Sequence, residues 1–132
     1  MASTMNDSCP LLIHRLLDRG PRLQPDNLLI TKTRDGYHSI SLREHMRRTY
    51  RLASACAAWG AKRGDVIASF CWNTGRHYQM YHAIPSMGCC LHTLNVRLSP
   101  KELVYIINHA EDRVIFVDGE AKRAAQCNHF CT

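Results

Sequence analysis

Three polar residues, His92, Asn95 and Arg97, stand close together in the stretch CLHTLNVRLSPKEL, residues 90–103. The stretch joins an apolar segment to the expected start of a helix. These residues could form a catalytic cluster, since a histidine moves protons and an arginine stabilises anions. They could also form a structural elbow, in which polar side chains pair with backbone groups that would otherwise be buried without a partner. We favour the elbow and keep ligand binding as the alternative.

Eight histidines and seven cysteines raise the possibility of a metal site. His77 and His82 are five residues apart, His109 is isolated, and CNHFC at 127–131 offers at most three ligands. A structural zinc site takes four well-placed ligands. We therefore assign no metal-binding residue, and we expect thiols without ligands and histidines that are either solvated or part of the core.

Nucleophilic catalysis by cysteine needs a site that favours the thiolate and a base nearby. Cys71 and Cys90 lie in apolar segments that read as strands, where burial disfavours the thiolate. Asp65, Asp112 and Asp118 flank expected strands, and we interpret them as turn and cap residues. No pair of carboxylates suggests general acid–base chemistry, so we assign no catalytic or cofactor-binding residue.

The compartment is predicted from the cysteines and from the start of the chain. The cysteine count is odd and the spacing irregular, which does not resemble a secreted disulfide framework. No secretory signal and no run of 18 apolar residues is visible. We expect reduced thiols, no transmembrane segment and a cytoplasmic location.

Hydrophobic periodicity and turn signals predict alternating helices and strands. In chain order, the pattern predicts a helix at 8–20 ended by Gly20-Pro21, a hairpin at 27–41 around Asp35-Gly36, a helix from Ser41 to Gly60, a strand at 66–72, a helix at 75–88, a strand at 89–94, a helix after Ser99 and a strand at 113–119. Ser41 with Glu44, and Ser99 with Glu102, each match a capping box.

Two helices carry apolar stripes that should face the core. The stripe of the helix at 41–60 is Leu42, Met46, Thr49, Leu52, Ala53, Cys56 and Trp59, and that of the helix after Ser99 is Leu103, Ile106, Ile107 and Ala110. Strands separated by helices of 10–15 residues indicate right-handed βαβ units. The predicted fold class is α/β: an N-terminal β-hairpin followed by βαβ units that form a small, incomplete parallel sheet with helices on both faces. Its predicted exposed edge is 113–118.

The chain is basic, with a formal net charge of +6 and a sequence pI of about 9.1. The densest basic segment is REHMRRTYR at 43–51, with Tyr50 within it. A solvated helix face is the interpretation we favour. Binding to nucleic acid is a further hypothesis, but no recognisable binding motif accompanies the charge, so we expect no nucleic-acid partner.

Two longer stretches resemble one known family. The first is SISLREHMRRTYRLASACAAWGAKRGDVIASFCWNT (39–74). It contains a motif that runs into a strand ending in an asparagine, at Gly60, Gly64, Asp65, Val66, Ile67, Ala68 and Asn73. The second is AIPSMGCCLHTLNVRLSPKELVYIINHAEDRVIFVD (83–118). In this order they resemble the N-terminal region of adenylate-forming acyl-CoA synthetases, the AMP-dependent synthetase/ligase family, in its fatty-acyl-CoA ligase branch.

The resemblance implies a domain organisation and a chemistry. It predicts a helical lead-in at 1–24, part of an AMP-binding domain at 25–118 and a divergent, truncated tail at 119–132. Complete members use ATP, Mg²⁺ and CoA to convert a fatty or other carboxylic acid to acyl-CoA, AMP and pyrophosphate. The family's phosphate loop, adenine-binding segment, ribose-binding aspartate and catalytic lysine map onto no residue here, so we assign the 132-residue chain itself no cofactor. The elbow at 95–98 could still contribute to acyl or nucleotide binding in a complete enzyme.

Two hypotheses of different classes follow from the resemblance. The first is a partial acyl-CoA ligase that is inactive alone, because the catalytic segments are absent. The second is a non-catalytic interaction module, which would associate with itself or pair through its exposed sheet edge with a full-length relative.

Overall fold

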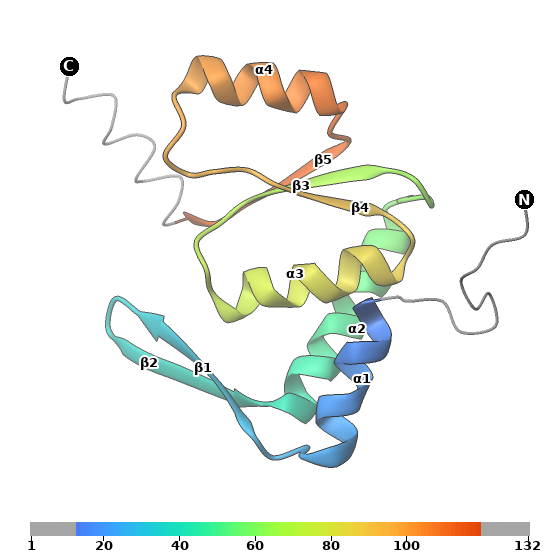
Figure 1. Ribbon diagram of the computed structural model, residues 1–132, viewed down its shortest axis with the longest axis vertical. Coiled ribbons are helices and arrows are strands. Elements are labelled where there is room, and N and C mark those ends of the chain that lie inside the picture. The colour runs from blue at the N-terminus through green and yellow to red at the C-terminus, as the bar shows by residue number, and fades with distance from the viewer. Residues whose placement is uncertain (1–12, 120–132) are drawn as a thin grey trace, which may run out of the picture.

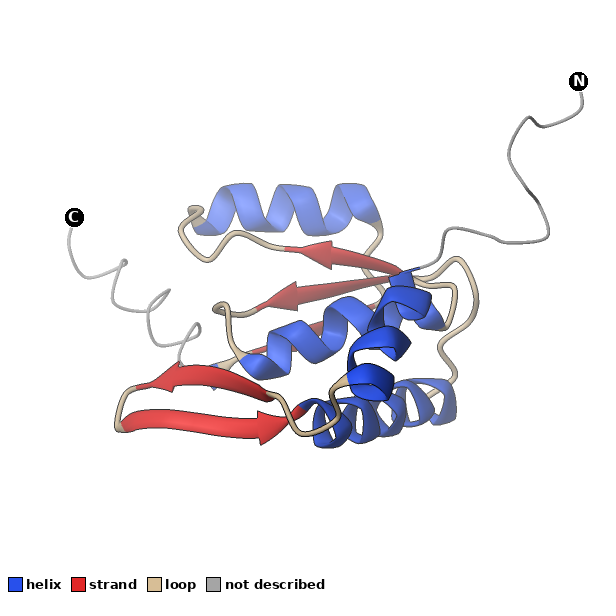
Figure 2. Ribbon diagram, turned by 60° about the horizontal axis from the view of Figure 1, so that its bottom comes forward, coloured by secondary structure: helices blue, strands red, loops and turns tan. Residues whose placement is uncertain are grey.

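Nine helices and strands follow one another in the computed structural model, which describes residues 13–119 of the 132-residue chain (Figures 1 and 2). In chain order they are α1 (Ile13–Leu23), β1 (Leu28–Thr33), β2 (Gly36–Ser41), α2 (Leu42–Ala58), β3 (Val66–Phe70), α3 (Gly75–Ser86), β4 (Cys90–Thr93), α4 (Pro100–Ala110) and β5 (Val114–Val117). This is the predicted order of elements.

The N-terminal hairpin forms where it was predicted, but its loop lies one residue before the predicted Asp35-Gly36 pair. β1 pairs with β2 in antiparallel register, with Leu28 opposite Ser41 and Thr33 opposite Gly36, so Arg34 and Asp35 form a two-residue loop. Gly36 has a φ of 140°, a backbone conformation that other residues rarely adopt. The hairpin stands apart from the parallel sheet and lies beside the start of α3 (Figure 1).

The parallel sheet has the strand order β4-β3-β5. β3 is central, with Ile67 opposite Leu91 of β4 and Val114 of β5. Ile67, Ala68 and Ser69 are at most 2% exposed. A strand that is buried on both faces has a nearly continuous apolar sequence. The prediction that this segment is a strand covered on both faces is confirmed.

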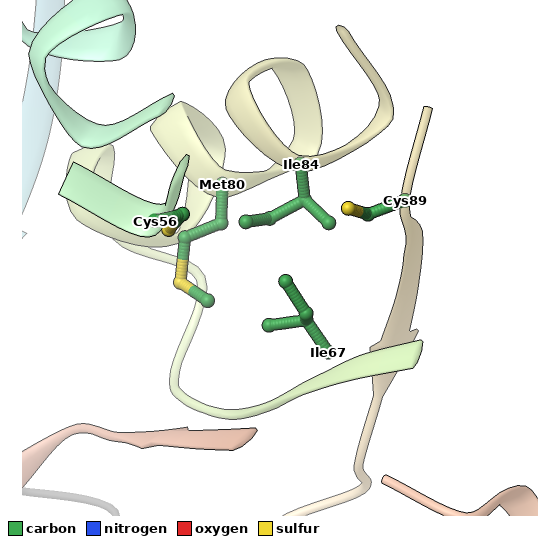
Figure 3. Close-up of a cluster of buried hydrophobic side chains, with 5 residues drawn as sticks. All are labelled: Cys56, Ile67, Met80, Ile84 and Cys89. Carbon is green, nitrogen blue, oxygen red and sulfur yellow. The ribbon is translucent and has the colours of Figure 1, made fainter. Parts of the chain in front are cut away.

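Helices cover both faces of this sheet, as Figure 1 shows, which confirms the predicted fold class. On one face, Ile67 packs with residues of α2, α3 and the start of β4; the cluster is Cys56, Ile67, Met80, Ile84 and Cys89 (Figure 3). On the other face, Ala68 and Phe70 pack with Leu94, Val96 and the apolar stripe of α4. The two faces of one short strand therefore hold both layers of the domain together.

The helix ends follow the predicted capping residues, with one difference. At α4, Ser99 and Glu102 form the complete reciprocal capping box. At α2, the Ser41 hydroxyl accepts a hydrogen bond from the Glu44 backbone N–H. The Glu44 carboxylate instead accepts hydrogen bonds from the side chains of two arginines in the next turn.

Two predictions about the helices were wrong. α1 does not stop at Gly20-Pro21 but continues to Leu23, because Gln24 N–H still donates to the Gly20 carbonyl at 2.8 Å. Trp59, predicted in the buried stripe of α2, is 64% exposed. It is the residue at which the helix ends, and its ring stacks on Phe116 of β5 with the centroids 6.0 Å apart. The first residues of the predicted helix, 8–12, lie outside the described part of the chain.

Candidate functional site

The candidate site lies where β3 and β5 end. In open α/β sheets, ligands bind outside the carboxyl ends of the strands, at the point where the chain connections diverge to opposite faces. Here the chain leaves β3, passes through α3 on one face of the sheet and enters β4. It then passes through α4 on the other face and returns to β5, which lies on the other side of β3. The divergence point is therefore between the ends of β3 and β5. We call the region at this point the crevice; Cys71, Asn73 and Thr74 follow β3, Asp118 follows β5, and His77 lies in the first turn of α3.

Local capping positions these side chains. Thr74 is the N-cap of α3, and its hydroxyl accepts a hydrogen bond from the His77 backbone N–H at 3.4 Å. At the end of β5, Asp118 N–H donates to the Phe70 carbonyl at 3.0 Å. The Cys71 thiol donates to the Phe116 carbonyl at 3.7 Å. The turn after β3 is thereby tied to both α3 and β5.

His77 is the most buried polar side chain of the crevice, at 5% exposed. Its Nε2 lies 2.9 Å from the Ser69 hydroxyl, at hydrogen-bonding distance. Burial lowers the pKa of His77, although the Trp72 carbonyl and the Asp118 carboxylate favour protonation. The imidazole is therefore neutral at neutral pH, and the Ser69–His77 pair is a neutral polar link between β3 and α3.

A cavity of about 270 Å³ opens beside the crevice, between the hairpin and α3. Its lining is Leu29, Ile30, Thr31, Lys32, Asn73, Thr74, Gly75, His77, Tyr78 and Tyr81. Gly75 lets the two walls approach, since its N–H donates to the Thr31 hydroxyl at 3.0 Å and a Cβ there would lie 2.8 Å from that oxygen. The lining combines two tyrosine rings and aliphatic side chains with amide and hydroxyl groups and one lysine, Lys32, a mixture typical of ligand-binding cavities.

The crevice is not built for nucleophilic catalysis. Ser69 is 0% exposed, so its hydroxyl cannot reach a substrate. Burial raises the pKa of the Cys71 thiol, and the charge of the nearby Asp118 carboxylate adds to this, while a hydrogen bond to the Asp118 backbone opposes it. A thiol with a raised pKa is a poor nucleophile. Within residues 13–119, no three histidine, cysteine or acidic side chains gather closely enough to hold a metal ion.

The three residues that first suggested a cluster do not form one. His92 Nδ1 faces the Asp112 carboxylate at 2.9 Å, and the Asp112 side chain is fully buried. Asn95 Oδ1 accepts a hydrogen bond from the Arg97 backbone N–H at 3.0 Å, while the Arg97 side chain is exposed. Asn95 thus has the local role of an elbow, and His92 links β4 to the turn before β5.

The other acidic and sulfur-containing residues behave mostly as predicted. Asp65 accepts a hydrogen bond from the Lys62 backbone N–H at 2.7 Å and forms an ion pair with Arg113. The first contact stabilises the turn before β3, as predicted. Cys56, Cys71, Cys89 and Cys90 are all free thiols. Cys90 was predicted in a buried strand but is exposed, because its strand, β4, pairs only with β3 among the described residues. The segment CNHFC at 127–131 lies outside the described residues.

The three histidines considered as metal ligands occupy both of the environments that were expected, the core and the solvated surface. His77 and His82 are buried, whereas His109 is exposed and stacks on Tyr105 with the ring centroids 5.7 Å apart. His109 lies in the last turn of α4, outside the apolar stripe of that helix.

The basic segment of α2 is a solvated face with internal ion pairing. Arg47 and Arg48 both hydrogen-bond to Glu44, and these bonds lower the pKa of Glu44 to about 2. Tyr50 donates a hydrogen bond from its hydroxyl to Asp18 of α1 at 2.9 Å. The side chains of Arg47, Arg48 and Tyr50 therefore already have partners within the domain. This disfavours the hypothesis that the segment binds nucleic acid.

Sequence reasoning missed two buried polar pairs. One is Ser69 with His77, and the other is His45 with His82. A signal for His45 was present, because it lies three residues after Leu42 and four before Thr49, on the helical stripe. Ser69 lies two residues after Ile67 in a strand and so faces the same side.

Comparison with known proteins identifies relatives. A profile described as "AMP-binding enzyme" matches residues 17–131. The long-chain-fatty-acid–CoA ligase of Thermus thermophilus is 39% identical over 117 residues, which cover 88% of this chain and 21% of that protein. The 3-methylmercaptopropionyl-CoA ligase of Ruegeria lacuscaerulensis is 38% identical over 110 residues, which cover 83% and 20%. The chain spans about a fifth of the length of these relatives.

Solved structures share the fold at low identity. The N-terminal domain of FACL13 from Mycobacterium tuberculosis superposes with a TM-score of 0.79 at 15% identity, covering 89% of this chain and 30% of that one. The anthranilate CoA ligase AuaEII gives a TM-score of 0.77 at 18% identity, covering 96% and 24%. With the profile match over most of the sequence, these findings confirm the resemblance: the chain belongs to the AMP-binding enzyme family, among acyl-CoA ligases.

Proposed function

We propose that the chain forms part of the N-terminal domain of an ATP-dependent carboxylate–CoA ligase. In this reaction a fatty or other carboxylic acid, ATP and CoA give acyl-CoA, AMP and pyrophosphate. The observation that carries the proposal is the family match over residues 17–131, together with relatives named as CoA ligases. The parallel layer with helices on both faces supports it.

The role we propose for these residues is structural support and neutral ligand contacts. Activation of a triphosphate needs oriented donors, cations and a metal ion. The crevice between β3 and β5 has one carboxylate, Asp118, and its residues include no lysine or arginine. No cluster of three metal-ligating side chains occurs within residues 13–119, and the neighbouring cavity adds one lysine, Lys32, so these residues fall short of the cations and donors that ATP with Mg²⁺ requires. We infer that the 132-residue chain does not complete the reaction alone, and that its segments divide at residues 24 and 118 as the resemblance predicts.

An exchange assay tests the inactivity. Purified 132-residue chain is incubated with ATP, Mg²⁺, a fatty acid and labelled pyrophosphate, and labelled ATP is measured. The Thermus thermophilus ligase is the positive control. We expect no label in ATP above the level without enzyme. Exchange that depends on the fatty acid would overturn the inactivity.

A chimera tests the structural role. Residues 25–118 replace the matching segment of the Thermus thermophilus ligase, and acyl-CoA formation is measured. We expect a folded chimera that retains activity, because the two proteins are 39% identical across the matched region. The matched control is the same chimera with Ala68→Asp, which places a carboxylate on a strand face that is 0% exposed and should prevent folding. A folded but inactive first chimera would contradict the proposed role.

The second candidate function is an interaction module. Among the described residues β5 pairs only with β3, and Ile115 and Val117 are 38% and 53% exposed. An exposed edge of this kind pairs with other chains. Size-exclusion chromatography with and without a full-length relative tests it. A monomer at every concentration that does not comigrate with the relative would eliminate this function.

We also propose a reducing location such as the cytoplasm, and the free state of the four described cysteines supports it. No helix within residues 13–119 has the length and apolarity to cross a membrane.

A further inference from the structure

Helix α1 exposes apolar and basic side chains on the same side. It packs against α2 and α3, which separate it from the parallel sheet (Figures 1 and 2). Leu16 and Leu23 are 75% and 67% exposed, and Ile13, one turn before Leu16, is 49% exposed. Single exposed apolar residues are normal at a protein surface. Here three of them follow one stripe of a single helix, which calls for an explanation.

Three arginines lie beside this stripe. Arg15 and Arg19 are exposed, and the side chain of Arg22 is 79% exposed. At 3.6 residues per turn, the three arginines and the two leucines fall within an arc of about 120° around the helix. The packed side of α1 lies outside this arc, where Gly20 is half-buried and a Cβ on it would lie 3.4 Å from Leu42 Cδ1. The arc of arginines and leucines therefore faces solvent.

The arc is positively charged. Asp18 is the one acidic residue of the sequence from Ile13 to Leu23, and it lies outside the arc. Its carboxylate accepts a hydrogen bond from the Tyr50 hydroxyl at 2.9 Å and lies 3.8 Å from the Arg22 guanidinium. Three arginines against one aspartate give these 11 residues a net charge of +2, with histidine counted as neutral. The whole chain, at +6, adds to the attraction for an anionic surface.

The observed end of α1 places two of these residues. Because the helix continues through Gly20-Pro21, Arg22 and Leu23 lie on the same side as Leu16 and Arg19. Leu16 and Leu23 are seven residues apart, about 10 Å along a helix that is about 16 Å long. The exposed apolar stripe therefore extends over most of α1.

Charge and apolarity together indicate the kind of partner. A basic amphipathic helix on a bilayer buries its apolar side at the boundary between headgroups and acyl chains, and it is attracted to anionic lipids. Arginine has a long stem, so its guanidinium reaches the lipid phosphates while a neighbouring leucine enters the apolar layer. A nucleic acid would neutralise the arginines but would leave Leu16 and Leu23 in water. An anionic bilayer accommodates both kinds of side chain.

We propose that α1 lies on the surface of an anionic lipid bilayer, with Leu16 and Leu23 at the acyl boundary and the arginines of the arc on lipid phosphates. The test is sedimentation of the 132-residue chain with vesicles of phosphatidylglycerol and phosphatidylcholine in equal amounts. Vesicles of phosphatidylcholine alone are the neutral comparison. A heparin column measures attraction to a polyanion that has no apolar layer.

We expect the anionic vesicles to bind at least about tenfold more tightly than the neutral ones, and less tightly as salt is added. Leu16→Ser with Leu23→Ser should weaken this binding at least about tenfold, without changing elution from heparin. Val104→Ser is the matched control, because Val104 is 59% exposed on α4, across the sheet from α1. Arg19→Gln should weaken vesicle binding about fivefold, whereas Lys101→Gln, on α4, should change it much less.

A fluorescent reporter locates the contact. Leu16→Trp should gain a blue-shifted emission with anionic vesicles when compared with the parent chain, and Val104→Trp should not. All these substitutions are at exposed positions, and an unfolding temperature equal to that of the parent shows that each variant folds.

Three results would overturn the membrane contact: no binding to anionic vesicles, equal binding by the parent and the double leucine variant, or an unshifted emission of Leu16→Trp. The second result would mean that charge alone attracts the chain, as it would to a nucleic acid. Vesicle binding is measured without ATP, CoA or fatty acid, so its failure would leave the proposed ligase role untouched.

Discussion

Protonation of one buried histidine should lower the unfolding free energy of this domain at acid pH. His45 is fully buried, and burial together with the neighbouring His82 lowers its pKa from 6.5 to about 4. The folded chain therefore holds His45 neutral where the unfolded chain would protonate it. The perturbation is a change of pH from 7.5 to 5.5, applied to the parent chain and to His45→Gln.

The sign and size follow from linkage. A base whose pKa is lowered by folding contributes stability above its unfolded pKa of 6.5, and that stability is lost as the pH falls towards about 4. The full difference corresponds to up to about 3 kcal/mol of unfolding free energy. Between pH 7.5 and 5.5, the share due to His45 is about 1.3 kcal/mol. Burial also lowers the pKa of His77 and His82, so both act in the same direction.

Urea unfolding followed by tryptophan fluorescence measures this share, because Trp59 and Trp72 report on the fold. The drop in unfolding free energy from pH 7.5 to 5.5 should be smaller in His45→Gln by about 1 kcal/mol. His38→Gln, an exposed histidine on β2, is the matched control and should retain the pH dependence of the parent.

An equal pH dependence in the parent and in His45→Gln would refute the reasoning, since His45 would then titrate alike in the folded and unfolded chains. A direct titration of the His45 resonances in the parent answers the same question without a substitution. A midpoint near 6.5 would mean that the ring is not held neutral by burial.

Three further substitutions test the packing, the buried pair and a helix cap, each by the urea midpoint. Ile67→Ala should cost about 2–5 kcal/mol, because the side chain is 2% exposed, whereas Ile115→Ala on the edge strand should cost much less; equal losses would contradict the assigned core. His92→Ala should cost about 1–3 kcal/mol because it leaves the fully buried Asp112 carboxylate without its partner, with a smaller loss for Asp112→Ala, which leaves only a partly exposed imidazole. Ser99→Ala should cost about 1 kcal/mol through the lost α4 cap, and no change would argue against the capping box.

Much of the fold was predictable because its signals are local. The Asp35-Gly36 turn, the caps at Ser41 and Ser99 and the apolar run of β3 each depend on neighbouring residues. The end of α1 was not predictable in this way, because Gly20-Pro21 normally ends a helix and here the next turn still closes. The prediction that Trp59 is buried was wrong for another reason. Its position relative to the core depends on where α2 ends and on its contact with Phe116, which lies far along the chain.

The site was less predictable because its pairs join distant elements. Nothing in the local sequence shows that Ser69 meets His77, that His45 meets His82 or that His92 meets Asp112 across 20 residues. Periodicity indicates which face a residue takes but not which residue it meets. For the histidines, the sequence left both a core and a solvated position open, and the topology was needed to place each ring and to identify its partner.

The exchange assay and the chimera test different parts of the proposed function, because the residues of the crevice suit only part of the reaction. Neutral side chains and one carboxylate can position a ligand at the ends of β3 and β5, but they cannot neutralise a triphosphate. An inactive 132-residue chain would agree with this limit and also with a misfolded sample. Activity in the chimera cannot arise from misfolding, because it requires residues 25–118 to adopt the relative's sheet and helices. The chimera therefore carries more weight, and its failure in a folded protein would count against the family role itself.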